Sequence, residues 1–523
     1  MANNPTPSAR LLRSGMVTAL ATLASRILGM FRDIAMASLL GAGLASDIFF
    51  FANRIPNFFR RLFAEGAFAQ AFVPVMTEYR THRTADELRG LLGRTLGALS
   101  LIVGTVCALG MLCAPVITAL FGYGWFDAWL HDAPDGFKFW QASHLLQITF
   151  PYLFLITITA LFCSVLNVFA SFAVPAITPC LLNLSLISAA LFVAPGQDNP
   201  NEILAWAMVA GGLIQLGFIL PFVLRLKVLG RPRLDFAHEG VRRIFRLMLP
   251  GLVSVSASQL NLLVNTVLAT FLATGSISYL YYSDRLLEFP IGIFAVAIST
   301  VILPALSAID YQHARAQYQA TLDCGVRLVL LLGLPSMAGI IALREPILRV
   351  LFMRGEFTLS HVQLSAASLL ASVSGLCAIM LVRVLVQGFA AIQDTRTPVR
   401  CAVTSMGANI VFNLVLVMPL GYVGLALSTA LAAFVNASLL LYLLWRRSIY
   451  AITRPTLMFI LRTAAAAGLM GAGVGYLSPA LEIWADYSTL DAVLWLCAFI
   501  ALGAAGYAAM LLLLGFRFSM IRR

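Results

Sequence analysis

Arginines and carboxylates occur within segments of the sequence that are otherwise apolar. They fall in three such segments: Arg26, Arg32 and Asp33; Asp47, Arg54, Arg60, Arg61 and Glu65; and Asp284, Arg285 and Glu288. An ionisable side chain at the middle of a bilayer costs at least about 2.5 kcal/mol, so charges inside spans indicate a functional site. Guanidinium groups bind phosphate through paired hydrogen bonds, which favours a phosphate-bearing ligand. The basic residues are nearly all arginines, although a GC-rich genome would produce the same bias.

The second segment presents one polar side if it is helical. At about 100° per residue, four of its charged residues fall within about 40° of one another. They are Asp47, Arg54, Arg61 and Glu65. Asn57 borders this stripe, and Asn53 and Arg60 lie further round the helix. Pro56 would kink the helix and shift the later residues.

In the third segment, an arginine lies between two acidic residues. Asp284 and Glu288 are four residues apart and Arg285 is three before Glu288, so they can share a helix face and a salt bridge. The alternative for all such charges is that they pair internally or extend to the membrane surface. That alternative is favoured for Arg13, Arg80 and Arg94, whereas a functional cavity is favoured for Arg26, Arg60, Arg61 and Arg285. The three segments carry six positive and five negative charges, which predicts a patterned cavity only slightly cationic overall.

The elements that position these residues are membrane-spanning helices. Of the 523 residues, 60% are hydrophobic and 11% are charged, and the mean hydropathy is +0.90. Soluble domains average about 25% charged residues. Apolar runs of roughly 20 residues predict an all-α polytopic protein with about fourteen helices. The spans are expected near 14–40, 46–77, 92–120, 142–169, 174–194, 203–228, 243–273, 277–306, 323–343, 363–391, 398–418, 423–445, 456–477 and 490–514.

The loops between these spans predict an orientation. Arginines cluster before the first span, after the second, between the sixth and seventh, after the twelfth and at the C-terminal end, while the opposite loops are mostly acidic. Positive loops stay in the cytoplasm, so both termini are expected there. This bias also accounts for most of the net charge of +12, so no nucleic-acid partner is expected. The N-terminal apolar stretch is interpreted as a retained helix rather than a cleaved signal.

No motif in the sequence indicates catalysis. The eight cysteines and six histidines are dispersed, with no CxxC pair, which predicts free thiols and no metal site. A membrane enzyme, such as a polyprenyl-linked glycosyltransferase, would need a catalytic base or metal-binding carboxylates on a loop, and neither these nor a P-loop is found. The sequence therefore predicts neither catalytic residues nor a cofactor. A purely structural membrane protein is disfavoured because of the intramembrane charge.

Two halves of the chain resemble each other. Residues 114–121 resemble 345–352, and residues 50–54 resemble 281–285, each at an offset of 231. Gly43 and Gly275, and Pro175 and Pro398, recur at similar offsets. An offset of this size matches six spans, so two parallel copies are predicted. The expected domains are an N-terminal lobe at 1–228, a C-terminal lobe at 229–447 and an added helix pair at 448–523.

Several of these segments resemble the MurJ (MviN) lipid II flippases. The resemblance is carried by residues 25–33 (SRILGMFRD), by Gly41 and Gly43 with the Ser-Asp pair at 46–47, by residues 56–68 (PNFFRRLFAEGAF) and by residues 281–290 (YYSDRLLEFP). It extends over essentially the whole chain. It implies a fold of the multidrug/oligosaccharidyl-lipid/polysaccharide exporter superfamily, with two six-helix lobes around a central cavity and two further helices lining a groove for the lipid tail.

The same resemblance implies roles for the charged residues. The arginines that would hold the diphosphate of the substrate are Arg26, Arg32, Arg60, Arg61 and Arg285. The acids that would pair with them in the empty carrier are Asp33, Asp47, Glu65, Asp284 and Glu288. The implied substrate is lipid II, a polyprenyl diphosphate-linked disaccharide peptide, carried to the periplasmic leaflet of the bacterial inner membrane in peptidoglycan biosynthesis. Membrane lipids and cell-wall synthesis proteins are the other implied partners.

The mechanism expected from the resemblance is alternating access of the two lobes. Some members bind sodium through acids on spans seven and eleven, but residues 243–273 and 398–418 contain no Asp or Glu. The membrane potential, worth about 2.3 kcal/mol per charge per 100 mV, is therefore the favoured energy source. An exporter of drugs or of another polyprenyl-linked oligosaccharide with the same fold is the alternative function, although the arginine cluster argues against it.

Overall fold

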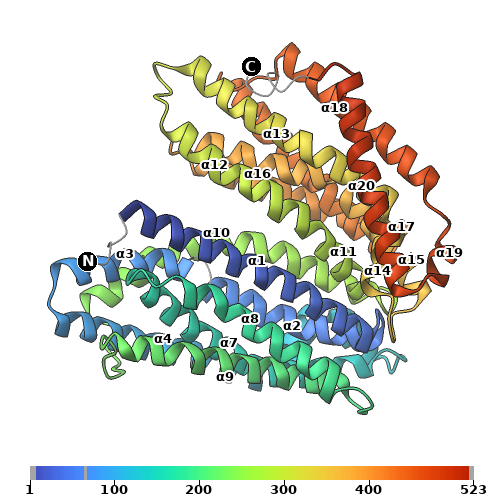
Figure 1. Ribbon diagram of the computed structural model, residues 1–523. Coiled ribbons are helices and arrows are strands. Elements are labelled where there is room, and N and C mark those ends of the chain that lie inside the picture. Colours follow the sequence, from blue (N-terminus) through green and yellow to red (C-terminus); the bar gives the residue numbers. More distant parts are fainter. Residues whose placement is uncertain (1–6, 64–66, 517–523) are drawn as a thin grey trace, which may run out of the picture. The chain divides into compact units, whose positions relative to one another are not determined.

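The computed structural model describes residues 7–63 and 67–516, and these form helices and connecting loops, without a strand (Figure 1). The chain divides into two compact units, Met1–Thr274 and Gly275–Arg523. The helices of unit 1 are α1 (Pro7–Leu40), α2 (Leu44–Phe63), α3 (Ala67–His82), α4 (Ala85–Leu112), α5 (Ala114–Phe121), α6 (Tyr123–Leu130), α7 (Phe137–Val168), α8 (Ala173–Ser188), the π-helix η1 (Ala189–Val193), α9 (Pro200–Arg225) and α10 (Glu239–Ala269).

Unit 2 continues the helical pattern. Its helices are α11 (Ser276–Pro290), the π-helix η2 (Ile291–Ala295), α12 (Val296–Ser307), α13 (Arg315–Ala342), α14 (Arg344–Phe352), α15 (Leu359–Val373), α16 (Leu376–Ala390), α17 (Arg396–Arg446), α18 (Arg454–Leu477), α19 (Leu481–Asp486) and α20 (Thr489–Leu513). The long α17 is two helices joined at a kink, because Gly421 has φ 56° and ψ −132°, which only glycine adopts readily.

The predicted all-α polytopic class is confirmed. Among the described residues, ten helices or helix runs are long and apolar enough to cross a membrane, and α17 covers two predicted spans. The remaining predicted spans, near 14–40, 46–77 and 243–273, correspond to α1, to α2 with α3, and to α10. The predicted span 92–120 ends early: α4 stops at Leu112 and α5 is a separate short helix, because Pro115 cannot donate the hydrogen bond that would continue the helix.

The repeat and the packing divide the chain at different places. The repeat places a boundary after residue 228, whereas the compact units meet after Thr274. Helix α10 lies between these points in the sequence and packs against α3 and α2 of unit 1. A duplication boundary and a packing boundary are different properties, so the lobes inferred from the repeat stay a prediction.

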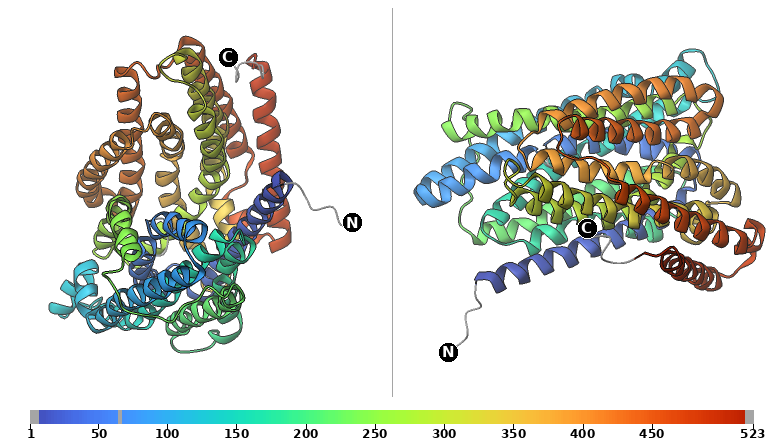
Figure 2. Two further views of the ribbon diagram at one scale, coloured as in Figure 1. Left: turned by 90° about the vertical axis from the view of Figure 1, so that its left-hand side faces the viewer. Right: turned by 90° about the horizontal axis from the view of Figure 1, so that it is seen from above.

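Unit 1 is built around α7, which packs against α9, α2 and α4. Its side chains are buried along most of its length, as expected of a helix surrounded by other helices. Helix α1 packs mainly on α8 and follows the edge of the unit (Figure 2). Leu20, Leu23, Ile27 and Phe31 of α1 are exposed, which suits a helix bordered by lipid on that side.

Unit 2 has its own apolar core. Helices α12, α13, α16 and α17 contribute buried side chains that include Val329, Met380 and Leu440. Local geometry from unit 1 recurs here: α14 follows α13 as α5 follows α4, with Leu343 and Cys113 in nearly the same conformation between them. These are the segments, 114–121 and 345–352, whose sequences resemble each other.

Candidate functional site: intramembrane arginines

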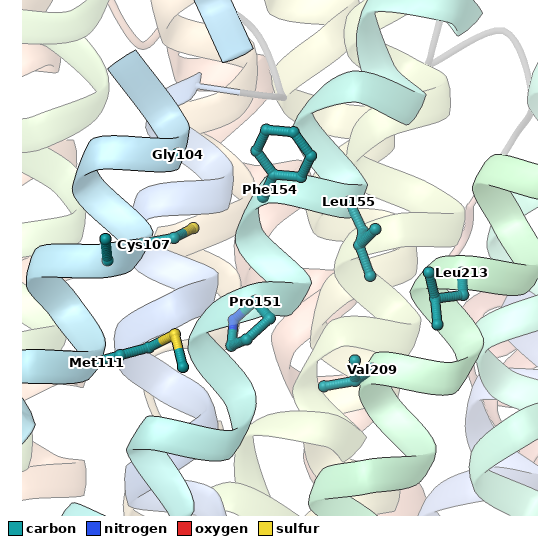
Figure 3. A pocket seen from close by; sticks show the side chains of 9 residues that line it. Gly104, Cys107, Met111, Pro151, Phe154, Leu155, Val209 and Leu213 are labelled. Carbon is teal, nitrogen blue, oxygen red and sulfur yellow. The ribbon is translucent and has the colours of Figure 1, made fainter. Parts of the chain in front are cut away.

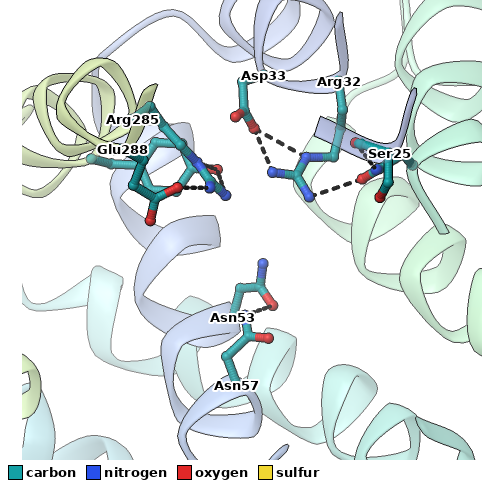
Figure 4. A network of polar contacts seen from close by, with 9 residues as sticks. Ser25, Arg32, Asp33, Asn53, Asn57, Arg285 and Glu288 are labelled. Atoms are coloured by element: carbon teal, nitrogen blue, oxygen red, sulfur yellow. Dashed lines mark hydrogen bonds and ion pairs between the residues drawn. The ribbon is translucent and has the colours of Figure 1, made fainter. Parts of the chain in front are cut away.

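Arg32 of α1 is held in place by an acid and an amide. Its Nε and one terminal nitrogen donate to the same oxygen of Asp33, at 3.0 and 2.7 Å, and the other terminal nitrogen donates to Oδ1 of Asn183 at 3.1 Å (Figure 4). The side chain of Asp33 is 3% exposed and that of Arg32 is 16% exposed. A nearly buried carboxylate with an adjacent guanidinium is a compensated pair, and the guanidinium remains the more accessible partner.

Asn183 is a residue of this site that the sequence did not single out. It lies on α8 and is 6% exposed. While its oxygen accepts from Arg32, its Nδ2 donates to the carbonyl oxygen of Ser25 at 3.3 Å. Ser25 and Arg32 are seven residues apart, two turns of α1, so one amide spans this face of the helix. The available signal was an asparagine inside the apolar span predicted at 174–194.

Two arginines of the predicted stripe on α2 are directed to α10. Arg54 donates to the hydroxyl of Thr266 at 2.7 Å, and Arg61 donates to Oε1 of Gln259 at 3.1 Å. Arg54 and Arg61 are seven residues apart and so share a helix face, as the sequence predicted. Thr266 and Gln259 are neutral, so these two contacts orient the guanidinium groups without cancelling their charge.

A second polar row runs along another side of α2. Arg60 donates from Nε to Oδ1 of Asn57 at 3.0 Å, and Asn57 donates in turn to Oδ1 of Asn53 at 3.0 Å. Figure 4 shows Asn53 and Asn57 along this row. The sequence had placed Arg60 and Asn53 away from the charged stripe. The row runs from the Arg60 guanidinium through the amides of Asn57 and Asn53. Three successive turns of α2 therefore carry hydrogen-bonding side chains.

The other predicted residues of unit 1 differ in their surroundings. Asp47 is buried in the first turn of α2, where a negative charge is stabilised by the helix dipole. Arg26 is exposed, and it forms no ion pair with any acid of the described part of the chain. Glu65 lies outside the described residues.

In unit 2, Arg285 is held by residues of its own helix, α11. It donates to Glu288 at 2.9 Å and to the hydroxyl of Tyr281 at 3.1 and 3.2 Å. Its guanidinium carbon also lies 5.0 Å from the centre of the Tyr281 ring, within the range of a cation–π contact. Glu288 is 59% exposed as a side chain, and Asp284 is exposed. The predicted salt bridge is therefore Arg285 with Glu288.

Helix α11 ends beside this pair at Pro290, and the π-helix η2 follows directly. Proline removes one hydrogen bond of the helix, and a π-helical turn is a local widening that often occurs at functional sites. Because Arg285 and Glu288 lie in the last turns before Pro290, the backbone of the helix can change its local geometry next to them.

The hollow in Figure 3 is of a different kind. It has a volume of about 390 Å³ and is formed by α4, α7 and α9, with Cys107, Pro151, Phe154 and Leu213 in its wall. No charged residue lines it, so it is not a place for a phosphate. The residues that the structure describes also include no group of three or more His, Cys, Asp or Glu side chains arranged to hold a metal ion.

Comparison with known proteins places this arrangement in a family. Residues 36–495 match the sequence model described as "Lipid II flippase MurJ". The chain belongs to the MurJ family. A "Probable lipid II flippase MurJ" of Vibrio cholerae is 47% identical over 512 residues, 98% of each chain. One of Haemophilus influenzae is 47% identical over 502 residues, 95% of this chain and 98% of the relative. The resemblance seen in the sequence is thus confirmed.

Solved structures agree with the family. The structure "Lipid II flippase MurJ, inward closed conformation" matches with a TM-score of 0.79 and 25% identity, covering 95% of this chain and 98% of that one. An inward-facing multidrug resistance MATE transporter matches with a TM-score of 0.65, 13% identity and coverage of 82% and 98%. The latter likeness concerns the fold alone. The predicted family and fold are confirmed, while the roles of the individual arginines stay predictions.

Proposed function

We propose that this protein carries lipid II from the cytoplasmic to the periplasmic leaflet of a bacterial inner membrane. The relatives that carry this name are similar over nearly the full length of both chains. Lipid II has a sugar-peptide headgroup, a diphosphate and a polyprenyl tail, so a carrier must move a large polar group and its charge through hydrocarbon. The function is transport without covalent chemistry, and it supplies the outer leaflet with a peptidoglycan precursor.

The observation that carries the proposal is the pairing of Arg32. In the empty carrier, the Arg32 guanidinium is compensated by Asp33 and oriented by Asn183. A diphosphate oxygen can share the guanidinium with the carboxylate while Asn183 keeps it oriented, so neither state leaves an uncompensated charge in a medium of low dielectric constant. Arg60 contributes a second guanidinium from α2, and Arg26 and Arg61 belong to the same predicted set.

Arg285 is the contribution of unit 2. Because Glu288 is largely exposed, it can release Arg285 to a phosphate at less cost than a buried acid could. Tyr281 keeps the guanidinium oriented when Glu288 has left, because the guanidinium lies against the face of the Tyr281 ring and donates to the Tyr281 hydroxyl. Asp47 and Asp284 serve as the further acidic partners.

Transport proceeds by alternating access, with both termini in the cytoplasm. Charges that shift with the carrier are acted on by the membrane potential, at about 2.3 kcal/mol per charge per 100 mV. Cysteine labelling from either side of the membrane tests the orientation: loop residues 231–237 should react only from the cytoplasmic side.

The function is tested by depleting the protein in its host and measuring where lipid II accumulates. We expect cytoplasmic-leaflet accumulation that wild type reverses and that Arg26→Ala, Arg60→Ala and Arg285→Ala do not. Arg243→Ala is the matched control, because Arg243 pairs with Glu78 at 2.8 Å with both side chains about half exposed. Normal outward delivery without the protein would refute the substrate and favour export of another polyprenyl-linked oligosaccharide. Rescue by all variants would keep the function and reject the site.

A further inference from the structure

The last two long helices, α18 and α20, lie on the outside of unit 2 (Figures 1 and 2). Many of their side chains are exposed and apolar, among them Leu461, Leu469, Trp495 and Leu512. A helix pair bordered by lipid gains little from the hydrophobic effect when it packs on its neighbours, because lipid tails are equally apolar. What fixes the pair to unit 2 must therefore be close packing and polar bonds.

The first polar bond lies at the start of α18. Asp323 of α13 is paired with Arg327 at 2.6 Å, and both side chains are less than 10% exposed. The hydroxyl of Thr456 lies 2.8 Å from both carboxylate oxygens, and that of Tyr450 donates to the same carboxylate at 2.7 Å. Arg327 also donates to the Thr456 hydroxyl at 2.8 Å. A buried charge pair of α13 is thus completed by the first turn of α18 and the loop before it.

The second bond lies in the middle of α13 and involves α20. Pro335 has no N–H, so it cannot donate to the carbonyl of Leu331 four residues earlier. The hydroxyl of Tyr507 on α20 donates to that carbonyl at 2.8 Å. An unsatisfied carbonyl is costly in hydrocarbon, where no water can replace the lost partner. Tyr507 therefore satisfies the group that Pro335 leaves open.

The third bond lies beyond the other end of α13. Arg349 of α14 is 8% exposed, and it donates to the carbonyl oxygens of Ala485, at 3.2 Å, and Tyr487. These two residues belong to the end of α19 and the loop that joins it to α20. One guanidinium thus holds the connection between α18 and α20 against α14.

Between these bonds, α18 runs alongside α13 in a constant register. The neighbouring pairs 323 and 456, 338 and 471, and 342 and 475 each differ by 133 residues. A Cβ placed on Gly471 would lie 3.0 Å from Cβ of Ala338, and one on Gly475 would lie 3.7 Å from Cβ of Ala342. Small residues on both sides allow this close approach, which is the main source of attraction between helices in lipid.

We infer that Tyr507, Arg349 and the bonded pair Asp323 and Thr456 are positioning residues. They fix α18 and α20 to the rest of unit 2 at three levels. The helix pair then moves with unit 2 as one body during transport and does not hinge against it. This inference rests on the proposed function, since it concerns the tail of the carried lipid. A lipid tail bound to α18 and α20 would then stay at a constant distance from Arg285 while the headgroup crosses the membrane.

A disulfide between α13 and α18 tests this directly. The 3.7 Å separation at positions 342 and 475 matches the spacing of about 3.8 Å between the Cβ atoms of a disulfide. We expect the oxidised Ala342→Cys/Gly475→Cys protein, with the crosslink located by mass spectrometry, to move lipid II in vesicles within about twofold of its reduced form. The single Ala342→Cys variant controls for oxidation of the eight native cysteines.

The outcomes separate the two proposals. Loss of transport on oxidation, restored by reductant, would overturn the one-body inference while keeping the flippase. If wild type itself moves no lipid II, the proposed function fails. The inference is then judged by the crosslink alone: complete formation with and without a membrane potential supports it, and a yield that changes with the potential refutes it.

A second pair of variants tests the positioning role of Tyr507. Tyr507→Phe leaves the Leu331 carbonyl without its donor and unties α20, so we expect a lower Tm, a raised KM for full-length lipid II and slower transport. Adding Pro335→Ala supplies an N–H to that carbonyl and should restore the Tm, yet α20 remains untied. We expect the KM for full-length lipid II to stay raised in the double variant and the KM for a short-tailed analogue to be unchanged. Recovery of transport together with the Tm would reduce Tyr507 to a structural role.

Discussion

Three arginines of unit 1 bond side chains of other helices, whereas Arg285 of unit 2 bonds two side chains of its own helix. Arg32 is bonded to α8, and Arg54 and Arg61 are bonded to α10, while Arg285 bonds Tyr281 and the largely exposed Glu288 of its own helix. A guanidinium oriented by a second helix is preorganised and gives up little entropy on binding. One that is tied within a single turn before a π-helix can follow a moving ligand. Unit 1 thus resembles a fixed half-site, and unit 2 an adaptable one.

The largest effect is expected at Arg32. Arg32→Ala removes the charge-assisted contact with the nearly buried Asp33, and removal of one partner of a buried ion pair destabilises proteins by about 3–5 kcal/mol. We therefore also propose Arg32→Lys, which retains the charge but not the paired geometry. Transport by the lysine variant should fall roughly 10- to 100-fold, as loss of a charged hydrogen bond predicts. The measurement is the initial rate of lipid II translocation in vesicles.

The control for Arg32 is the same substitution at Arg285. If unit 2 is the adaptable half, a lysine there should serve nearly as well as arginine, and Arg285→Lys should lose less than Arg32→Lys. Equal losses at both positions would remove the distinction between a fixed and an adaptable half-site.

A smaller effect is expected at Asn183. Asn183→Ala removes the bond to Arg32 and the bond to the Ser25 carbonyl, whereas Asn183→Asp retains an acceptor and adds a charge. The alanine variant should weaken binding of the diphosphate by about 1 kcal/mol, or roughly fivefold. The aspartate variant should trap Arg32 and slow transport more than it weakens folding. Binding and transport measured side by side distinguish these results, and unchanged values for both variants would show that Arg32 does not depend on α8.

Glu288 offers a test of similar size in unit 2. Glu288→Gln keeps the shape but loses the charge, so Arg285 is more available to the substrate. Because Glu288 is largely exposed, folding should change little. We expect tighter lipid II binding and slower release, seen as a lower KM and a lower kcat. A rise in KM would instead indicate that Glu288 contacts the substrate.

These contrasts also mark what the sequence could predict. The charged residues of α1, α2 and α11 were recognisable because charge in an apolar span is costly and therefore rare. Thr266, Gln259 and Asn183 were not, since neutral polar side chains enter apolar helices at little cost and leave a weak signal. The salt bridge of Arg285 followed from local spacing, whereas every bond of Arg32 and Arg61 to another helix depends on packing that no single-sequence pattern contains.

The packing boundary shows the same limit. The repeat at an offset of 231 residues could be read from the sequence, and α5 and α14 repeat one local geometry. That α10 packs with unit 1 depends on contacts with α2 and α3, among them the bonds of Arg54 and Arg61. Duplication determines which helices resemble one another, but close packing and polar bonds between side chains determine which helices are held together.

The smallest expected effect compares the two units outside the membrane, where each has a loop aspartate paired with an arginine. Asp235 of unit 1 bonds Arg94 at 2.9 Å, and Asp394 of unit 2 bonds Arg447. Burial alone would raise the pKa of Asp394, but hydrogen bonds from Thr397 and Arg447 outweigh it and lower the pKa from 3.8 to about 2. Burial likewise raises the pKa of Asp235, and hydrogen bonds, first that from Arg94, lower it overall.

Because the folded-state pKa is depressed, the stability contributed by Asp394 is present above its unfolded pKa and is lost as the pH falls through about 4 to 2. Thermal unfolding of Asp394→Asn should therefore show a lower Tm than wild type at pH 6, and the difference should shrink toward pH 3. Asp235→Asn should show the same trend with a smaller difference, because Asp235 is the more exposed acid. A Tm difference independent of pH in both variants would mean that the aspartates act through shape and not through charge.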